Sequence, residues 1–148
     1  MAINRYGTRK GDIFHVGSEC RKGYFPQNNL IGYSSIDFHP DGLLLGTGAV
    51  DSTVRIWDVK SGTIAAQFSD FSGKVTSLSF SENGYYLATA SECNLVKIWD
   101  LRKLANIHTI ELPDMASKVK FDESAQFLGV SHGHSVRYVN FCLIKACF

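Results

Sequence analysis

The sequence of this chain aligns with itself, without a gap, at an offset of 42 residues. Residues 33–58 read YSSIDFHPDGLLLGTGAVDSTVRIWD and residues 75–100 read VTSLSFSENGYYLATASECNLVKIWD, with nine of the 26 aligned positions identical. A repeat of about 40 residues that ends in Trp-Asp is typical of small β-sheets stacked along a chain. The self-similarity therefore predicts several like units rather than one sequentially built core.

The repeated positions predict strands and tight turns. Gly42 and Gly84 close the tetrapeptides HPDG and SENG, which favour tight turns between antiparallel strands. Apolar residues recur at every second position around these turns, which is the period of a strand. Four short strands per repeat make a propeller blade. The predicted strands span about 34–38, 43–48, 53–57 and 62–68 in the first repeat, and about 75–80, 85–90, 95–99 and 106–112 in the second.

A third and weaker copy follows, as KVKFDESAQFLGVSHGHSVRYVN. Phe121 and Val136 keep the register, whereas Ala125, Val139 and Asn140 replace the turn Gly, the Trp and the Asp. Propellers close with four to eight blades. We therefore predict an all-β propeller fragment of about two and a half to three four-stranded blades that does not close into a ring.

The repeats divide the chain into an N-terminal segment that matches neither repeat, two blades, and a degenerate partial blade with an apolar tail. These segments are residues 1–32, 33–74, 75–116 and 117–148. Ile13, Phe14 and Val16 are interpreted as a strand of a preceding blade; the alternative for the locally basic N-terminal segment is an arm that contacts RNA.

Both ends of the predicted stack are uncapped. Terminal repeats of stacked proteins normally carry a polar outer face, yet the last residues read VNFCLIKACF. We therefore hypothesise a truncated or alternatively processed product, a fragment that self-associates through its open blade faces, or a marginally stable fold.

Three strings carry a family resemblance: FHPDGLLLGTG, SENGYYLATA and VKIWDLRKL. They resemble WD-repeat β-propellers and, within these, the C-terminal propeller of the splicing-associated U-box ubiquitin ligases, over roughly residues 33–130. The resemblance implies a nuclear protein-interaction module in pre-mRNA splicing, ubiquitination and DNA repair. It implies partners among the splicing nineteen complex and the ubiquitin machinery. The U-box that gives this family its transferase activity has no counterpart in the sequence, so enzymatic activity stays uncertain.

The resemblance also assigns structural roles. WD-repeat blades contain a buried hydrogen-bond network of a Trp, a Ser or Thr, a His and a turn Asp. Phe71 stands where the linking His would be, and Cys93 replaces the Asp of the second repeat. Five residues fill roles in this network: Thr47, Asp51 and Trp57 in the first repeat, Thr89 and Trp99 in the second.

One motif suggests a binding function. Trp99-Asp100-Leu101-Arg102 fits the WDxR pattern that, in WD-repeat proteins, marks docking to the adaptor of cullin-type ubiquitin ligases. An Arg just past a strand can project from the blade rim and form bidentate hydrogen bonds. The candidate binding residues are thus Trp99, Asp100 and Arg102; alternatively, the motif only marks the end of a blade strand. A substrate receptor or scaffold for a cullin ligase is the alternative function, together with a truncated isoform without independent activity.

Composition and the other motifs exclude several classes. A net charge of +1 with 20% charged residues gives no bulk electrostatic site for nucleic acid, and no segment is apolar enough to span a bilayer. The four cysteines form no CxxC pair. His132 and His134 in SHGHS are interpreted as turn residues rather than a metal pair, and no catalytic motif is found. We predict no metal, no cofactor and no catalytic residue.

Overall fold

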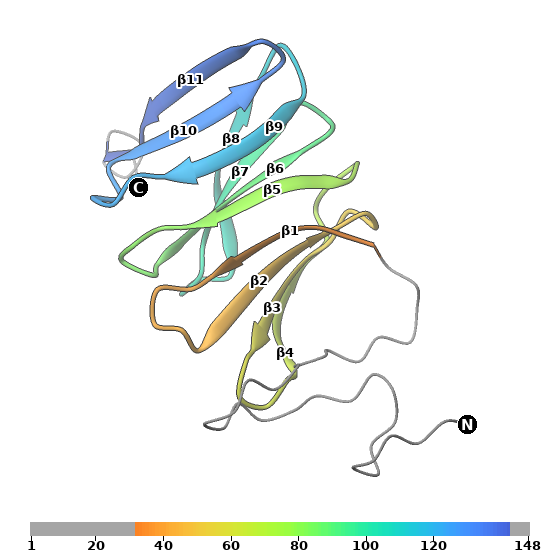
Figure 1. Ribbon diagram of the computed structural model, residues 1–148, viewed down its shortest axis with the longest axis vertical. Coiled ribbons are helices and arrows are strands. Elements are labelled where there is room, and N and C mark those ends of the chain that lie inside the picture. The colour runs from red at the N-terminus through yellow and green to blue at the C-terminus, as the bar shows by residue number, and fades with distance from the viewer. Residues whose placement is uncertain (1–31, 143–148) are drawn as a thin grey trace, which may run out of the picture.

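The computed structural model describes residues 32–142, which form 11 β-strands in three antiparallel sheets (Figure 1). Blade 1 contains β1 (Tyr33–Phe38), β2 (Leu44–Ala49), β3 (Val54–Asp58) and β4 (Ile64–Phe68). Blade 2 contains β5 (Val75–Phe80), β6 (Tyr86–Ser91), β7 (Leu95–Asp100) and β8 (Ala105–Glu111). Blade 3 contains β9 (Ala116–Phe121), β10 (Phe127–His132) and β11 (Ser135–Asn140).

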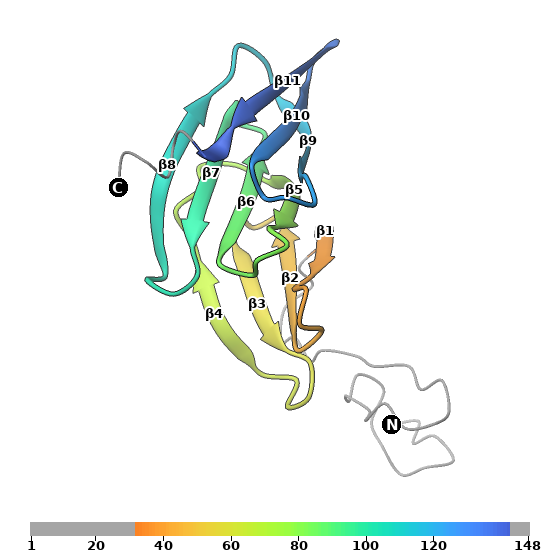
Figure 2. The same cartoon turned by 90° about the vertical axis from the view of Figure 1, so that its left-hand side faces the viewer.

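The prediction of an all-β propeller fragment without ring closure is confirmed. Blades 1 and 2 each have four strands, hydrogen-bonded in sequence order, and blade 3 has three within the described residues. The first strands of the three blades, β1, β5 and β9, lie side by side (Figure 1). The sheets fan out from them toward β4 and β8 (Figure 2). The strand predicted around Ile13 lies outside the described residues.

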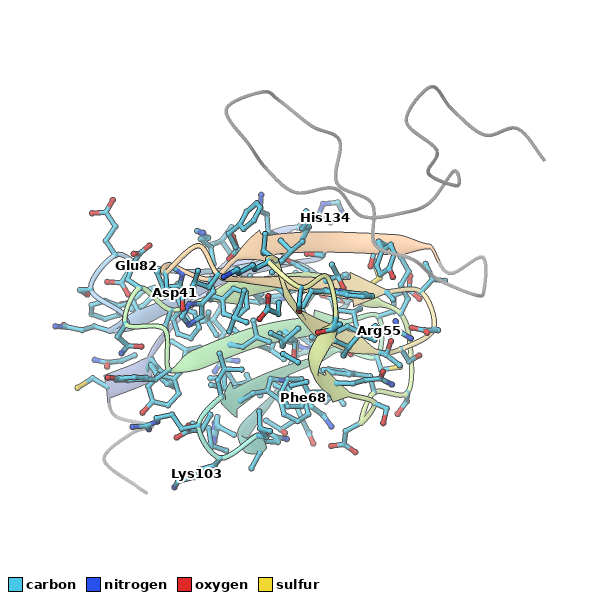
Figure 3. All side chains as sticks on the ribbon, turned by 90° about the horizontal axis from the view of Figure 1, so that it is seen from below. Asp41, Arg55, Phe68, Glu82, Lys103 and His134 are labelled. Atoms are coloured by element: carbon cyan, nitrogen blue, oxygen red, sulfur yellow. The ribbon has the colours of Figure 1, made fainter. Side chains whose placement is uncertain are left out.

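The tight turns between the first two strands of each blade form as predicted. Gly42 and Gly84 both have a φ of +72°, a conformation that glycine adopts without steric cost. In blade 3 Ala125 takes the same role with a φ of +51°, so the turn persists although its glycine is lost. The first two turns are neighbours, because the ring Nε2 of His39 lies 2.8 Å from the Gly84 carbonyl oxygen. Figure 3 labels Asp41 and Glu82 from these two turns on the same side of the molecule.

Each blade buries one face against the next. Between blades 1 and 2, the core joins Val54, Ile56 and Phe68 to residues of β5, β6 and β7, including Phe80 and Trp99. The contact is close because β2 carries glycines: a Cβ at Gly46 would lie 2.9 Å from Cε2 of Phe80. The second core joins β6, β7 and β8 to β9 and β10. Propeller stacking is thus continuous across the three sheets.

The first residue after β11 belongs to this second core. Phe141 is fully buried and its ring lies 5.3 Å from that of Phe121 and 4.9 Å from that of Tyr86. Phe141, which directly precedes the predicted apolar tail, is therefore a core residue; of the tail itself only the exposed Cys142 lies within the described part of the chain.

Candidate functional site

The paired Trp and Thr side chains form the hydrogen bonds that the sequence predicts. The indole N–H of Trp57 donates to Oγ1 of Thr47 and that of Trp99 donates to Oγ1 of Thr89, each at 2.9 Å. All four side chains are buried. An indole N–H without an acceptor in such a place would cost about 1–3 kcal/mol, so these pairs stabilise the blades and are not a binding site.

Blade 2 fills the position of the missing histidine with an aromatic ring and a cation. The ring of Phe71 lies 5.7 Å from that of Trp99, and Nζ of Lys97 lies 5.3 Å from the Phe71 ring. The same ammonium group donates to the Asp70 carboxylate at 2.7 Å. In blade 1, Asp51 keeps its turn position and accepts from Thr53 and Arg55. The incomplete network of the second repeat is thus replaced by packing and a cation–π contact.

The three residues of the rim motif differ in accessibility. Trp99 and Asp100 are buried, whereas the side chain of Arg102 is half exposed. The guanidinium of Arg102 donates to both carboxylate oxygens of Asp100, at 3.1 and 2.7 Å, and stacks 4.6 Å above the ring of Tyr85. The structure therefore holds Arg102 in one place on the rim, and Arg102 is the residue of the motif that solvent reaches.

The ion pair between Arg102 and Asp100 shifts the pKa values of both side chains. The hydrogen bonds from Arg102 hold the pKa of the Asp100 carboxyl below its usual value, and the backbone N–H groups of Arg102 and Lys103 add to that effect. The carboxylate in turn raises the pKa of Arg102. Both groups stay charged near neutral pH, so the rim presents a guanidinium of fixed orientation within an ion pair that carries no net charge.

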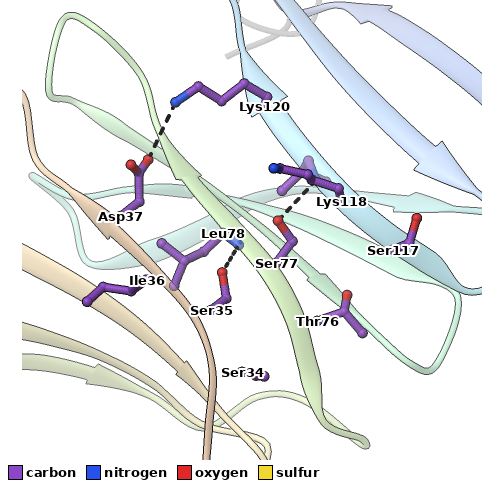
Figure 4. A pocket seen from close by; sticks show the side chains of 11 residues that line it. Ser34, Ser35, Ile36, Asp37, Thr76, Ser77, Leu78, Ser117, Lys118 and Lys120 are labelled. Atoms are coloured by element: carbon purple, nitrogen blue, oxygen red, sulfur yellow. Dashed lines mark hydrogen bonds and ion pairs between the residues drawn. The ribbon is translucent and has the colours of Figure 1, made fainter.

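A polar groove that the sequence reasoning missed lies along the first strands of all three blades. It has a volume of about 450 Å³. Figure 4 shows its side chains arriving from β1, β5 and β9. The lining residues are Ser34, Ser35, Ile36 and Asp37 from blade 1, Thr76, Ser77 and Leu78 from blade 2, and Ser117, Lys118, Val119 and Lys120 from blade 3.

Hydrogen bonds along this groove link each blade to the next. The backbone N–H groups of Leu78 and Phe80 donate to Ser35 Oγ and Asp37 Oδ2, both at 3.0 Å. The pattern repeats one blade later, where backbone N–H groups of β9 donate to Oγ of Ser77 and of Ser79, both at 3.2 Å. We call these side chain to backbone bonds the inter-blade ladder.

In blade 3, lysines replace the side-chain acceptors of the inter-blade ladder. Lys118 and Lys120 occupy the positions of the serine and aspartate acceptors of the earlier blades, and both are exposed. Nζ of Lys120 lies 3.9 Å from Asp37 Oδ2 of blade 1 (Figure 4). The replacement of the acceptors by lysine is present in the sequence. It becomes visible only when the polar positions of the three repeats are aligned. The groove combines hydroxyls, one carboxylate and two ammonium groups, which suits contacts to polar peptide groups rather than catalysis.

Among residues 32–142, no group of three His, Cys, Asp or Glu side chains is close enough to hold a metal ion. His132 is buried in β10, whereas His134 is exposed in the turn before β11, so the two do not face one site. No helix within this part of the chain is long and apolar enough to cross a membrane.

Comparison with known proteins identifies the class. The WD domain, G-beta repeat family matches residues 25–58 and 62–100. The β-propeller domain of Cps50 (Swd1) from Myceliophteria thermophila superposes on 73% of this chain and 34% of its own with a TM-score of 0.69 at 24% identity. U3-55K superposes on 79% of this chain and 38% of its own with a TM-score of 0.74 at 22% identity. The chain therefore belongs to the WD-repeat β-propeller proteins.

Within this class, the chain resembles Pre-mRNA-processing factor 19. It is 52% identical to the Arabidopsis thaliana protein named Pre-mRNA-processing factor 19 homolog 2 over 101 residues, or 68% of this chain. It is 56% identical to Pre-mRNA-processing factor 19 of Homo sapiens over 96 residues, or 63% of the chain, and 50% identical to that of Caenorhabditis elegans over 121 residues, or 80%. The chain spans 19% to 24% of the length of these relatives.

Proposed function

We propose that this chain is a protein-interaction module of nuclear pre-mRNA splicing complexes. The observation that carries the proposal is the identity of 50% to 56% with Pre-mRNA-processing factor 19 over the blades. The matched stretches cover 63% to 80% of this chain. The partners we propose are proteins of the splicing nineteen complex, and the associated roles are ubiquitination and DNA repair.

The described surface supports binding rather than chemistry. The groove along β1, β5 and β9 presents oriented hydroxyl, carboxylate and ammonium groups, and the rim presents the fixed guanidinium of Arg102. Sites of this kind on a rigid sheet scaffold recognise other chains through hydrogen bonds of fixed geometry. We propose that Arg102, held by Asp100 at the end of the strand that Trp99 anchors, is one contact point on the rim.

We test the proposal by affinity purification of the tagged chain from nuclear extract. The expected result is recovery of splicing nineteen complex proteins by the wild-type chain, detected by immunoblotting. The variant Lys118→Glu/Lys120→Glu reverses the charge of the groove and is expected to reduce recovery at least several-fold. The matched control is Lys60→Glu, an exposed lysine on the β3–β4 turn outside both the groove and the Arg102 rim site. Recovery of no splicing protein by a folded wild-type chain would refute the proposal.

The alternative function is docking to a cullin-type ligase through the rim. The comparisons do not favour it, since the named relatives are pre-mRNA-processing factors. One experiment distinguishes the two functions by comparing the wild-type chain with Arg102→Ala. If the alternative holds, the wild-type chain recovers a cullin adaptor and the variant does not. If it does not hold, neither chain recovers the adaptor.

A further inference from the structure

The polar groove along β1, β5 and β9 contains hydrogen-bond donors that the fold does not use. A serine hydroxyl has one hydrogen to donate and two lone pairs that accept. The Oγ atoms of Ser35 and Ser77 each accept a backbone N–H of the next blade, from Leu78 and Val119 respectively. Neither hydroxyl donates its own hydrogen to any of the residues that the structure describes. Two hydroxyl hydrogens therefore remain for a ligand.

Ser77 is fixed more firmly than an ordinary surface serine. It lines the groove although it is only 6% exposed. Its Oγ lies 3.2 Å from the backbone nitrogen of Val119, so the side chain cannot turn away without breaking the inter-blade ladder. A hydroxyl hydrogen in such a place is stabilised by an acceptor. The position thus favours a ligand atom that accepts a hydrogen bond.

Two ammonium groups belong to the same groove. Lys118 and Lys120 take the place of ladder acceptors, and an ammonium group can only donate. The side chain of Lys120 reaches back across blade 2, because its Nζ lies 3.9 Å from Oδ2 of Asp37 in blade 1 (Figure 4). The ammonium group of Lys118 has no acceptor or ion-pair partner within residues 32–142. Two ammonium groups and one carboxylate give the lining a net charge of +1, which favours an anion.

The composition of the lining selects a carboxylate among the anions. A phosphate group carries about two negative charges and is matched best by the planar fork of Arg, yet no Arg lines the groove. Single-stranded nucleic acid is bound through aromatic rings on which bases stack, and the lining residues include no aromatic ring. A single net positive charge beside hydroxyl donors matches the carboxylate of an Asp or Glu side chain.

The spacing of the two lysines indicates an extended ligand. Lys118 and Lys120 are two positions apart on β9, so their side chains leave the same face of the strand about 6.6 Å apart. Alternate side chains of an extended peptide have the same spacing. A carboxylate at Lys120 competes with Asp37, but the contact between these two residues is long and the lysine side chain is 66% exposed. Such a pair contributes little and opposes binding only weakly.

We propose that the groove binds an extended segment of a partner protein that carries acidic side chains at alternate positions. The carboxylates accept hydrogen bonds from the ammonium groups of Lys118 and Lys120 and from the hydroxyls of Ser35 and Ser77. All of these groups come from β1, β5 and β9. That the ligand is a protein rests on the interaction function proposed above, and the acidic segment specifies its chemistry.

Fluorescence anisotropy with the purified 148-residue chain tests the proposal. The probe is a labelled synthetic peptide of alternating Glu and Ser, and the matched peptide has Gln in place of Glu. The chain is expected to bind the Glu peptide about tenfold more tightly, because hydrogen bonds between charged groups are the stronger ones. Equal affinity for the two peptides, or tighter binding of a single-stranded RNA of the same length, would overturn the proposal.

Variants of Lys118 locate the binding to the groove. Lys118→Met removes the ammonium group and keeps a long side chain, and it is expected to weaken binding of the Glu peptide about tenfold. Lys118→Arg keeps the charge and is expected to retain most of the affinity. Lys60→Met, at an exposed lysine of the β3–β4 turn, is the matched control and is expected to bind as the wild type does. Circular dichroism checks that each chain is folded, and equal affinities of the folded Lys118→Met and Lys60→Met chains would refute the site.

The peptide assay and the affinity purification from nuclear extract can fail separately. The assay contains no splicing protein, so a chain that recovers splicing proteins but does not distinguish Glu from Gln peptides refutes the acidic segment alone. A chain that prefers the Glu peptide but recovers no splicing protein supports the acidic-peptide site and refutes the splicing function.

Discussion

At the scale of single residues, the chain shows how a degenerate repeat retains its fold. The Trp and Thr pairs persist in blades 1 and 2, while the histidine that the family resemblance implies is replaced by Phe71 with Lys97 above its ring. A polar link is thereby exchanged for aromatic packing and an ion pair. The buried polar groups of these pairs need their hydrogen-bond partners. Removing one partner is therefore expected to lower the free energy of unfolding.

Thr89→Val is expected to lower the free energy of unfolding by about 1–3 kcal/mol, because the indole N–H of Trp99 then has no acceptor in a buried place. Chemical denaturation measures the loss. Thr109→Val is the control, since Thr109 is exposed and accepts from an exposed Asn106. Equal effects of the two substitutions would show that the buried pair contributes nothing specific.

The Asp100–Arg102 pair predicts a pH dependence. The pKa of Asp100 is lowered from 3.8 by Arg102, so its contribution to stability is present above that pH and is lost as the pH falls through the lower folded-state pKa. Asp100→Asn is expected to destabilise the chain at pH 7 and to make the loss of stability below about pH 4 shallower. Urea denaturation between pH 7 and pH 2.5 measures both.

The control for this titration is Glu82→Gln, which removes an exposed carboxylate from a turn. It is expected to leave the stability at pH 7 nearly unchanged. An Asp100→Asn chain with the same pH profile as the wild type would show that the rim pair is not coupled to folding.

At the scale of elements, the blades fit together through matched side-chain sizes. Gly48 of β2 faces Val75 of β5, with the ideal Cβ position only 2.6 Å from a Val75 methyl group. At the next interface the corresponding residues are Ala90 and Ala116, both fully buried. A glycine opposite a valine and an alanine opposite an alanine fill similar space, so the two interfaces reach the same spacing by different means.

Gly48→Ala is expected to destabilise the chain by about 1–3 kcal/mol through overpacking, because the β-branched Val75 cannot turn away. Val75→Ala in the same chain is expected to recover part of this loss by recreating the pair found at the second interface. A double-mutant cycle with chemical denaturation measures the coupling. Additive effects would contradict the size matching, and Gly129→Ala, at an open face, serves as the control.

At the scale of the whole molecule, the outer faces of blades 1 and 3 carry apolar side chains that no other blade covers within residues 32–142. Phe38, Val136 and Tyr138 are exposed on these faces, whereas the residues at the same positions of the neighbouring blades are buried. Stability should therefore depend on whatever covers these faces, and not only on contacts within the chain.

The sequence predicts correctly the structural features whose residues recur in each repeat. The strand ranges, the turns at Gly42 and Gly84, and the Trp and Thr pairs followed from residues that recur at one spacing, and the structure confirms them. The rim motif was found as a unit, but its members differ in depth: burial of Trp99 and Asp100 depends on the neighbouring strands and leaves Arg102 to solvent.

The sequence by itself determined the repeat, the alternation of strand faces and the turn geometry, because these depend on local backbone preference and on side chains two residues apart. Only the tertiary structure decided which faces are covered and where the polar groove lies, because those contacts join positions about 40 residues apart in different sheets. The same Phe is buried in blades 2 and 3 and exposed in blade 1; its neighbour, and not its own identity, makes the difference.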